Sequence, residues 1–300
     1  GYKYITDNNY ITDNNLSYPW WRKNLRDNNN NGEIDPDYDG VDLNRNYDLN
    51  WNQGGSSDPS SWTFRGPYPF SEKETKAKRD LVLRRNFALA ISYHSYGEVI
   101  LYPWSWPGTG APAPDNMLIQ EIASELAKRI KNEDGNGTYS YRTAHGASQS
   151  LCWMYGVPGV IELLVELGTS FIPSGEKIQP IVNSNLKGLF YIMDRASGAG
   201  IKVKVMDADT GEPICANIRI AEIDNFNYIV PRFTNPYTGI HVRLLQKGEY
   251  TIIISAFGYI TKRIKVNVGE QMKCINVYLP KIEEWKMRRL MVQLENINGN

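Results

Sequence analysis

The periodicity of the apolar residues changes near Ser197, and this change limits the architecture that the chain can adopt. Before Ser197, short apolar runs alternate with longer segments whose apolar residues recur every three or four positions, as in an amphipathic helix. Alternating strands and helices indicate an α/β layer in which helices cover a sheet. The runs predict strands over 87–93, 97–102 and 159–167, and the longer segments predict helices over 71–86, 115–131 and 178–195.

After the glycine-containing segment 197–200, apolar residues alternate with polar ones or form short runs between turns. This pattern is typical of a small all-β domain. We therefore predict an α/β domain over 1–197 and an all-β domain over 198–281. In the remaining residues, 282–300, one apolar stripe predicts a helical tail.

The composition argues against several kinds of partner. The chain has 33 Lys and Arg residues against 33 Asp and Glu residues, so its balance gives no reason to expect nucleic acid or an anionic membrane. No apolar run approaches the roughly 18 residues that a membrane span needs. Three cysteines are too few for a disulfide scaffold, and Cys215 and Cys274 either pair with each other or remain buried thiols.

Two residues suited to catalysis lie at the ends of predicted strands. His94 follows the strand 87–93, where a neutral imidazole can bind zinc, or is held by a hydrogen bond at the rim of the core. Glu166 ends the strand 159–167, where partial burial raises the pKa of a carboxyl group and suits it to act as a general base. Glu162 lies four residues before Glu166, so the two-residue period of a strand places both side chains on the same face of the sheet. Either glutamate can instead be a buried structural acid.

Two polar clusters lie upstream of these strands. The motif Asp42-Leu-Asn-Arg-Asn46 places Asn44 beside Arg45, and an arginine can bind a carboxylate through two parallel hydrogen bonds. The segment 22–26 adds three cations ending at Arg26, which can stabilise an oxyanion near a cleft. Taken singly, a surface ion pair and a solvated basic turn are the competing interpretations.

The order of these motifs resembles that of the carboxypeptidase A-like zinc carboxypeptidases. The resemblance covers about residues 1–196 and implies a mixed β-sheet flanked by helices, without the first strands of the family's sheet. The C-terminal domain resembles the transthyretin-like, or carboxypeptidase regulatory-like, β-sandwich through Asp209-Thr-Gly-Glu-Pro213 and Ala256-Phe-Gly-Tyr259. The catalytic-domain motifs are Arg22-Lys-Asn24, Asp42-Leu-Asn-Arg-Asn46, His94-Ser-Tyr96, Leu101-Tyr-Pro-Trp104, Ser150-Leu-Cys-Trp-Met-Tyr-Gly156 and Glu166-Leu-Gly-Thr169.

This resemblance implies a metallocarboxypeptidase that removes C-terminal residues from peptides or proteins by means of zinc-activated water. It implies that His94 is a zinc ligand, that Glu166 is the general base, and that Asn44 and Arg45 bind the terminal carboxylate. Arg26 resembles the arginine that stabilises the tetrahedral oxyanion, although the segment is one residue longer than the usual Arg-Lys-Asn-Arg.

Specificity is expected from Leu151, which falls where the family selects the C-terminal side chain. An apolar residue there favours an apolar or aromatic terminal residue. Ala144 stands at the position of the family's mobile tyrosine, and Tyr141 or His145 are the candidates to replace it.

The family's other two zinc ligands, a His-x-x-Glu pair, are absent from this sequence. Its three histidines are His94, His145 and His241, and none has Glu at the third following position. The zinc site of this chain is therefore incomplete, because a catalytic site needs three protein ligands. Two interpretations remain: part of a longer active enzyme, or a non-catalytic relative that binds peptide or cell-wall termini.

The loop 27–39 carries a separate cation hypothesis. Asp27, Asn29, Asn31 and Asp35 offer oxygen atoms at alternate positions around Gly32, as in the first half of an EF-hand calcium loop. The twelfth position holds a tyrosine instead of the bidentate glutamate, so a solvated Asn-rich loop is the alternative. We expect an extracellular or secreted location, since a start at Gly1 in mid-pattern is compatible with a removed signal segment.

Overall fold

The computed structural model describes residues 21–35, 37–145 and 147–283, so nearly all of the predicted tail helix over 282–300 lies outside the described residues. These described residues divide into two compact units, one formed by residues up to 82 together with 89–193, and the other by 83–88 together with the residues from 194 onward. The short segment 83–88 belongs with the C-terminal unit, where the Arg84 carbonyl accepts a hydrogen bond from Asn235 Nδ2 at 3.0 Å.

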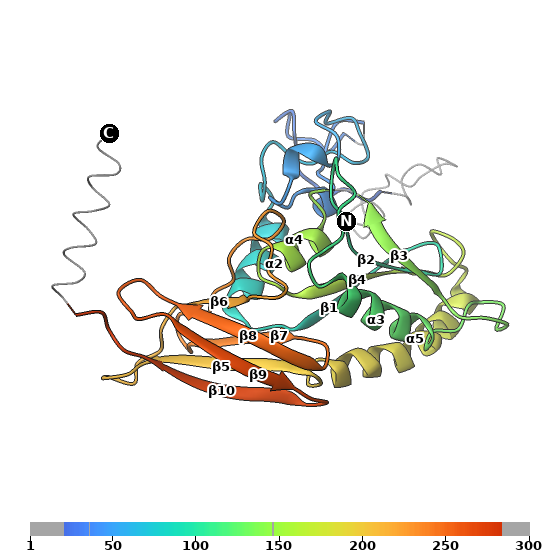
Figure 1. Cartoon of the computed structure of the whole chain (residues 1–300). Helices are drawn as coiled ribbons and strands as arrows, with labels where there is room; N and C mark the ends of the chain where they lie inside the picture. Colours follow the sequence, from blue (N-terminus) through green and yellow to red (C-terminus); the bar gives the residue numbers. More distant parts are fainter. Residues whose placement is uncertain (1–20, 36, 146, 284–300) are drawn as a thin grey trace. The chain divides into compact units, whose positions relative to one another are not determined.

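The first unit is built on a four-stranded mixed sheet in the order β1-β4-β2-β3 (Figure 1). Strand β1 runs parallel to β4, and β2 runs parallel to β3, whereas β2 and β4 are antiparallel. The predicted α/β class with a mixed sheet is therefore confirmed. The strands span Leu89–Ser95 (β1), Val99–Ser105 (β2), Ser140–His145 (β3) and Ile161–Leu167 (β4).

Helices cover both faces of this sheet, with α2 and α4 on one side and α3 and α5 on the other (Figure 1). The apolar stripe of α3 is buried as its period predicts. Gly188 of α5 lies against this stripe, and a Cβ atom there would sit 2.7 Å from Leu126 Cδ1. The helices span Lys73–Arg84 (α2), Asn116–Ala127 (α3), Ser150–Gly156 (α4) and Gly175–Arg195 (α5).

Strand β3 and helix α4 have no counterpart among the predicted elements. All seven residues of α4 are buried, so this short helix has no polar face and no amphipathic period. Two short 3₁₀ helices, η1 (Leu43–Arg45) and η2 (Trp51–Gln53), lie in the long segment before α2. These unpredicted elements matter for function because α4 and η1 contact each other at the site described below.

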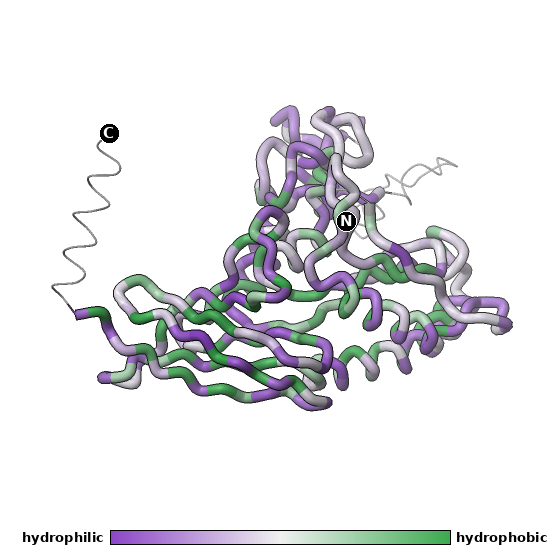
Figure 2. The backbone as a smooth tube through the Cα atoms, viewed as in Figure 1, coloured by the Kyte–Doolittle hydropathy of each residue, from purple (hydrophilic) through white to green (hydrophobic). Residues whose placement is uncertain are grey.

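The C-terminal unit consists of two three-stranded sheets, β10-β5-β7 and β6-β8-β9. Apolar residues from both sheets form one core, as in a β-sandwich. Along its strands, hydrophobic and hydrophilic residues alternate, because one face lies on the core (Figure 2). The strands span Gly200–Asp207 (β5), Asn217–Ile220 (β6), Ile240–Leu244 (β7), Gly248–Ser255 (β8), Lys262–Val268 (β9) and Met272–Leu279 (β10).

The cysteines differ from both expectations for the C-terminal unit. Cys215 and Cys274 are free and exposed, so they form neither a disulfide nor buried thiols. Cys152 of α4 is buried, and burial raises the pKa of its thiol to about 12. None of the helices in the described part of the chain is long and apolar enough to cross a membrane.

Candidate active site

The site begins where strands β1 and β4 end. His94 and Glu166 are paired in register on these parallel strands, each one residue before the end of its strand. Paired residues on adjacent strands lie about 4.8 Å apart and direct their side chains to the same face. The sheet thus brings together the histidine and the glutamate that the sequence singled out, at the carboxyl ends of parallel strands.

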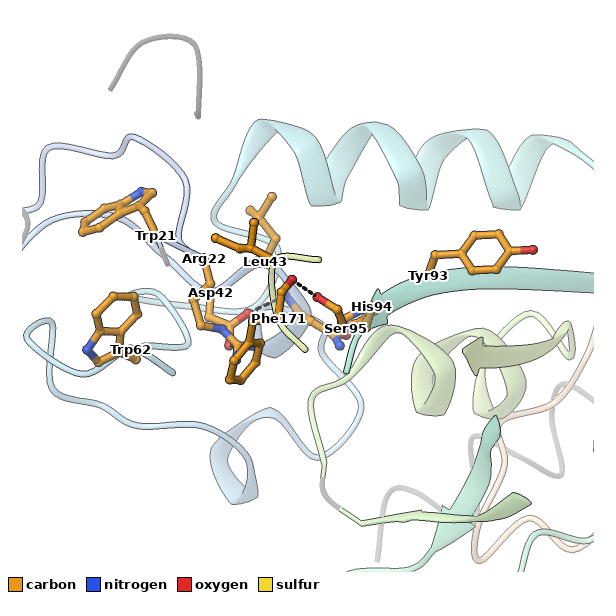
Figure 3. A pocket seen from close by; sticks show the side chains of 11 residues that line it. Trp21, Arg22, Asp42, Leu43, Trp62, Tyr93, His94, Ser95 and Phe171 are labelled. Atoms are coloured by element: carbon orange, nitrogen blue, oxygen red, sulfur yellow. Dashed lines mark hydrogen bonds and ion pairs between the residues drawn. The ribbon is translucent and has the colours of Figure 1, made fainter. Parts of the chain in front are cut away.

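A cavity of ≈ 730 Å³ opens beside His94 (Figure 3). Its polar lining comes from three separate segments: Arg22 from the N-terminal loop, Asp42 and Asn44 from η1 and its cap, and His94 and Ser95 from β1. Two of the predicted site residues, Asn44 and His94, therefore share one cavity. Glu166, Arg45, Arg26 and Leu151 are not among the residues that line it.

The turn that carries Asn44 is fixed by its own polar residues. The Asp42 carboxylate caps η1 by accepting from Asn44 N at 3.1 Å and is paired with Arg22 at 2.9 Å. Asn46 is fully buried, and its amide bonds both backbone and side chains of the segment that leads into α2. Asn44 Oδ1 accepts from Ser150 N, the first residue of α4, at 2.9 Å.

The last of these bonds sets the orientation of the Asn44 amide. Because Oδ1 accepts from Ser150 N, Nδ2 is the end of the Asn44 amide that remains to donate to a ligand in the cavity that Asn44 lines. Arg45 does not line the cavity, and its Nη1 donates to the Asn44 carbonyl at 2.9 Å. Burial lowers the pKa of Arg45, and the charge of Arg22 acts in the same direction.

Arg26 and Arg22 occupy different places in the N-terminal segment. Arg26, the residue predicted at the oxyanion position, pairs with the buried Glu72 at 3.0 Å, away from the cavity lining. Arg22 lines the cavity next to Asp42. Reasoning from the sequence did not single out Arg22, because it shares one cationic cluster with Lys23 and Arg26.

Burial controls the charge states of the pair on the strands. The pKa of His94 is lowered, first by burial and then by the charges of Arg22 and Arg45, so the imidazole is neutral at pH 7. The pKa of Glu166 is raised by burial, while Arg22 and Arg142 oppose that shift. Glu166 thus has the raised proton affinity of a general base. The positive charges of Arg22 and Arg142 limit the increase in its pKa.

Arg142 is a second residue that the sequence did not single out. It lies on β3 opposite Leu101 of β2, and Leu101 is in turn opposite Leu164 of β4, which is two residues before Glu166. This register places Arg142 on the face of the sheet that carries Glu166 and His94. This position in β3 explains why the positive charge of Arg142 affects the pKa of Glu166.

Glu162 and Leu151 are buried structural neighbours of the cavity. Glu162 is fully buried, and its carboxylate accepts from Lys78 Nζ at 3.1 Å and from Ser150 Oγ at 2.5 Å. Leu151 is fully buried in α4, next to the residue that holds Asn44. Glu162 thus has the burial and the hydrogen-bonded partners of a structural acid.

Aromatic residues also line the cavity (Figure 3). Trp21 and Trp62 meet edge to face with ring centroids 6.3 Å apart. On the other side, the Ser95 hydroxyl donates to the Phe171 carbonyl at 2.8 Å, which joins the end of β1 to the loop after β4. The Phe171 ring also packs against Tyr96 at 4.6 Å.

The two candidates for the tyrosine role lie on β3. Tyr141 is exposed and its ring centroid is 6.5 Å from that of Tyr102 of β2. His145 is the last residue of β3, and its backbone is in register with Ser105. Ala144, at the position of the family's tyrosine, is buried.

In the loop predicted to bind calcium, the candidate ligands accept hydrogen bonds from the loop itself. Both carboxylate oxygens of Asp27 accept from the backbone, one from Asn31 N and the other from Gly32 N. Asp35 Oδ1 accepts from Asp37 N. Asp39 is fully buried and bridges Asn28 N and Asp35 N, each at 2.8 Å.

The donors near His94 do not form a zinc site by themselves. Zinc at a catalytic centre needs three protein ligands. Within the described ranges, no cluster of three or more His, Cys, Asp or Glu side chains could hold a metal ion. Asp42, the acid that shares the cavity with His94, is already paired with Arg22.

The chain is thus an α/β protein in which helices flank a mixed sheet. Its polar cavity lies at the carboxyl ends of parallel strands, where α/β proteins commonly bind ligands. The family model of the zinc carboxypeptidases matches residues 1–188, and the chain belongs to this family.

Individual relatives are similar over part of their length. Zinc carboxypeptidase A 1 of Anopheles gambiae is 30% identical over 176 residues, which are 54% of this chain and 40% of that protein. Carboxypeptidase A1 of Rattus norvegicus is 30% identical over 165 residues, 52% of this chain and 39% of that protein. The chain thus spans about two fifths of the length of these curated relatives.

A solved structure agrees with this relationship. Bovine thrombin-activatable fibrinolysis inhibitor, determined in complex with tick carboxypeptidase inhibitor, is 28% identical with a TM-score of 0.51. The match covers 59% of this chain and 62% of that chain.

Proposed function

We propose that this protein binds the carboxyl terminus of a peptide or protein and acts in its removal as a metallocarboxypeptidase. One observation carries the proposal: the Asn44 amide donor and the neutral His94 share a cavity, and Glu166 is the register partner of His94. Membership of the zinc carboxypeptidase family supports the same class of activity.

The terminal carboxylate is assigned to Asn44 Nδ2 and the neighbouring arginines. A carboxylate accepts several hydrogen bonds, and amide and guanidinium groups are its usual donors. Arg45 shares in this role as the second member of the predicted pair, and Arg22 supplies a cation within the cavity itself. Leu151, which is buried in α4, remains the proposed determinant of an apolar terminal residue.

For the chemical step, Glu166 is the proposed base, because burial raises its pKa. Its carboxylate takes the proton of the attacking water and later gives it to the leaving amine. We assign stabilisation of the oxyanion to Arg22 in place of Arg26, since Arg22 lines the cavity and Arg26 is paired with Glu72. Zinc is implied by the family, but the donors in the described part of the chain do not complete its site.

A non-catalytic role is the second candidate. It is favoured by the lack of a metal-binding cluster among the described residues, whereas the proposed donors for a carboxylate are present. Such a protein would bind peptide or cell-wall termini without cleaving them. For the 300-residue chain on its own, we expect little or no zinc-dependent hydrolysis.

Calorimetric titration with two peptides that differ only in a free or an amidated carboxyl terminus tests both candidates. We expect the free acid to bind about tenfold more tightly, or ~1.4 kcal/mol, and Asn44→Ala to remove most of this difference. Asn276→Ala, an exposed asparagine on β10, is the control and should change nothing. Equal affinity for both peptides in the unaltered chain would contradict both candidates.

Mass spectrometry of the free-acid peptide, incubated with the chain and zinc, then separates the two candidates. Loss of the last residue at a clear rate would support the peptidase and contradict our expectation of little turnover by this chain. Binding without cleavage would favour a binding role for the chain as it stands. An extracellular or secreted location also remains a proposal, and fractionation of the source cells would test it.

A further inference from the structure

The proposed carboxylate donor is oriented by a residue that does not touch the cavity. Asn44 could present either its oxygen or its nitrogen to a ligand, because the two ends of an amide have the same shape. The backbone N–H of Ser150 decides between them by donating to Oδ1 at 2.9 Å. The position of Ser150 therefore determines whether the cavity offers a donor to a carboxylate.

Ser150 is held in turn by an ion pair between the buried Glu162 and the partly exposed Lys78. Lys78 Nζ donates to Ser150 Oγ at 2.5 Å, and Ser150 Oγ donates to Glu162 Oε2 at 2.5 Å. Lys78 Nζ also bonds Glu162 Oε1 at 3.1 Å, which closes a ring of three groups. Each group comes from a different element: Lys78 from α2, Ser150 from α4 and Glu162 from β4.

Burial makes this ring sensitive to the loss of a member. The Glu162 side chain is 1% exposed and that of Lys78 is 35% exposed. A carboxylate so far from water needs a cation and hydrogen bonds, and without Lys78 it would be left unpaired. Since the serine hydroxyl bonds both ions, any rearrangement of the pair acts first on Ser150.

We propose that Lys78 is a positioning residue for the binding of a terminal carboxylate, acting through Glu162 and Ser150 on the Asn44 amide. This inference rests on the proposed function, because it assumes that Asn44 binds the carboxylate. Lys78 itself touches neither the cavity nor the ligand. Its role is to keep the first residue of α4 where its N–H meets Asn44 Oδ1.

The experiment measures carboxylate selectivity, the ratio of the Kd of the amidated peptide to that of the free acid. Three variants of the full chain are compared: Ser150→Ala, its conservative counterpart Ser150→Thr, and the double variant Lys78→Met with Glu162→Leu. The double variant removes both charges together, so it leaves no buried ion unpaired and folds even where Lys78→Met alone does not. Lys177→Met, which breaks the Lys177–Glu133 pair at 2.8 Å elsewhere in this unit, is the matched control.

We expect Ser150→Ala and the double variant to lose selectivity at least fivefold, while the Kd of the amidated peptide changes less than twofold. Ser150→Thr should retain selectivity because it keeps the hydroxyl, and Lys177→Met should behave as the unaltered chain. A purely structural ring would lower Tm in the double variant and leave the ratio intact. That result, with full selectivity in the unaltered chain, overturns this inference alone, whereas no selectivity in the unaltered chain overturns the proposed function and this inference with it.

Discussion

His94 and Glu166 are register partners on the parallel strands β1 and β4, one residue before each strand ends. Their side chains leave the same face of the sheet, so their proximity follows from strand pairing and needs no contribution from a flexible loop. The groups that complete the cavity, Arg22 and Asn44, come from irregular segments and depend on polar contacts for their positions.

Arg22 and Arg26 should differ in their effect on ligand binding. Each pairs with a buried carboxylate, Asp42 at 2.9 Å and Glu72 at 3.0 Å, so replacement by glutamine has a similar structural cost at both sites. Arg22→Gln should weaken binding of a free-acid peptide about tenfold, or ~1.4 kcal/mol, because a cation leaves the cavity. Arg26→Gln should change affinity less than twofold in the same titration. A larger loss of affinity in Arg26→Gln would show that Arg26 contributes to ligand binding.

Arg142 should tune the proton affinity of Glu166. Its positive charge favours the ionised carboxylate and so opposes the rise that burial causes. Arg142→Gln should therefore raise the pKa of Glu166 further, and Arg142→Lys should leave it nearly unchanged. Titration of the carboxyl ¹³C resonance by NMR measures this shift, and an unaltered or lowered pKa in Arg142→Gln would contradict the register argument.

His241 should make the C-terminal unit sensitive to acid. Burial, with the charges of Arg232 and Arg243, lowers the pKa of this imidazole from 6.5 to about 3. The unfolded chain binds a proton near pH 6.5 and the folded protein resists it until about pH 3, so the free energy of unfolding falls as the pH decreases between these values. Above pH 6.5 this contribution is fully present.

The measurement is the free energy of unfolding in urea at pH 7.5 and pH 5.5. His241→Asn should reduce the difference between these two values, whatever its effect on absolute stability. Most carboxyl groups titrate below this interval, so they contribute little to the slope. An equal slope in both proteins would argue that His241 titrates normally.

The three cysteines should react at two different rates. Cys215 and Cys274 are exposed, whereas Cys152 is buried with its pKa raised to about 12. Because the thiolate is the reactive form, a thiol reagent should modify two groups rapidly and the third only after unfolding. A colorimetric thiol assay with and without denaturant measures this. Fast modification of all three would mean that α4 opens readily.

The calcium hypothesis makes a prediction of its own. A cation bound by Asp27, Asn29, Asn31 and Asp35 would stabilise the folded state by mass action, so millimolar calcium should raise Tm. Asp27→Ala should abolish the increase, and magnesium should produce a smaller one. An unchanged Tm in calcium would leave the loop as an Asn-rich turn held by its own hydrogen bonds.

The sequence predicted the parts of the fold that have a clear period. The stripe of α3 and the apolar runs of β1, β2 and β4 all lie where expected, and the residues after 200 form strands as their pattern predicted. Helix α4 was missed because it is buried on every side. Strand β3 was missed because it lies at the edge of the sheet and carries polar residues such as Arg142 and Ser140.

The candidate site shows a similar division. His94 and Glu166 could be found because each ends an apolar run, and Asn44 because it belongs to a dense polar motif. Arg22 could not be separated from Arg26 by sequence, since both belong to one cationic segment and only their partners Asp42 and Glu72 distinguish them. Contacts between distant segments carry that information, as the bond between Ser150 and Asn44 also does.

Strand β4 carries both Glu162, which anchors Ser150, and Glu166, the proposed base, four residues further along. The geometry of one strand therefore fixes the distance between Glu162 and Glu166. Glu162 holds Ser150, whose N–H holds the Asn44 amide, so β4 links the proposed carboxylate donor to the proposed base. Such a coupling would let loops around the cavity diverge without disturbing the distance on which a reaction at the last peptide bond depends.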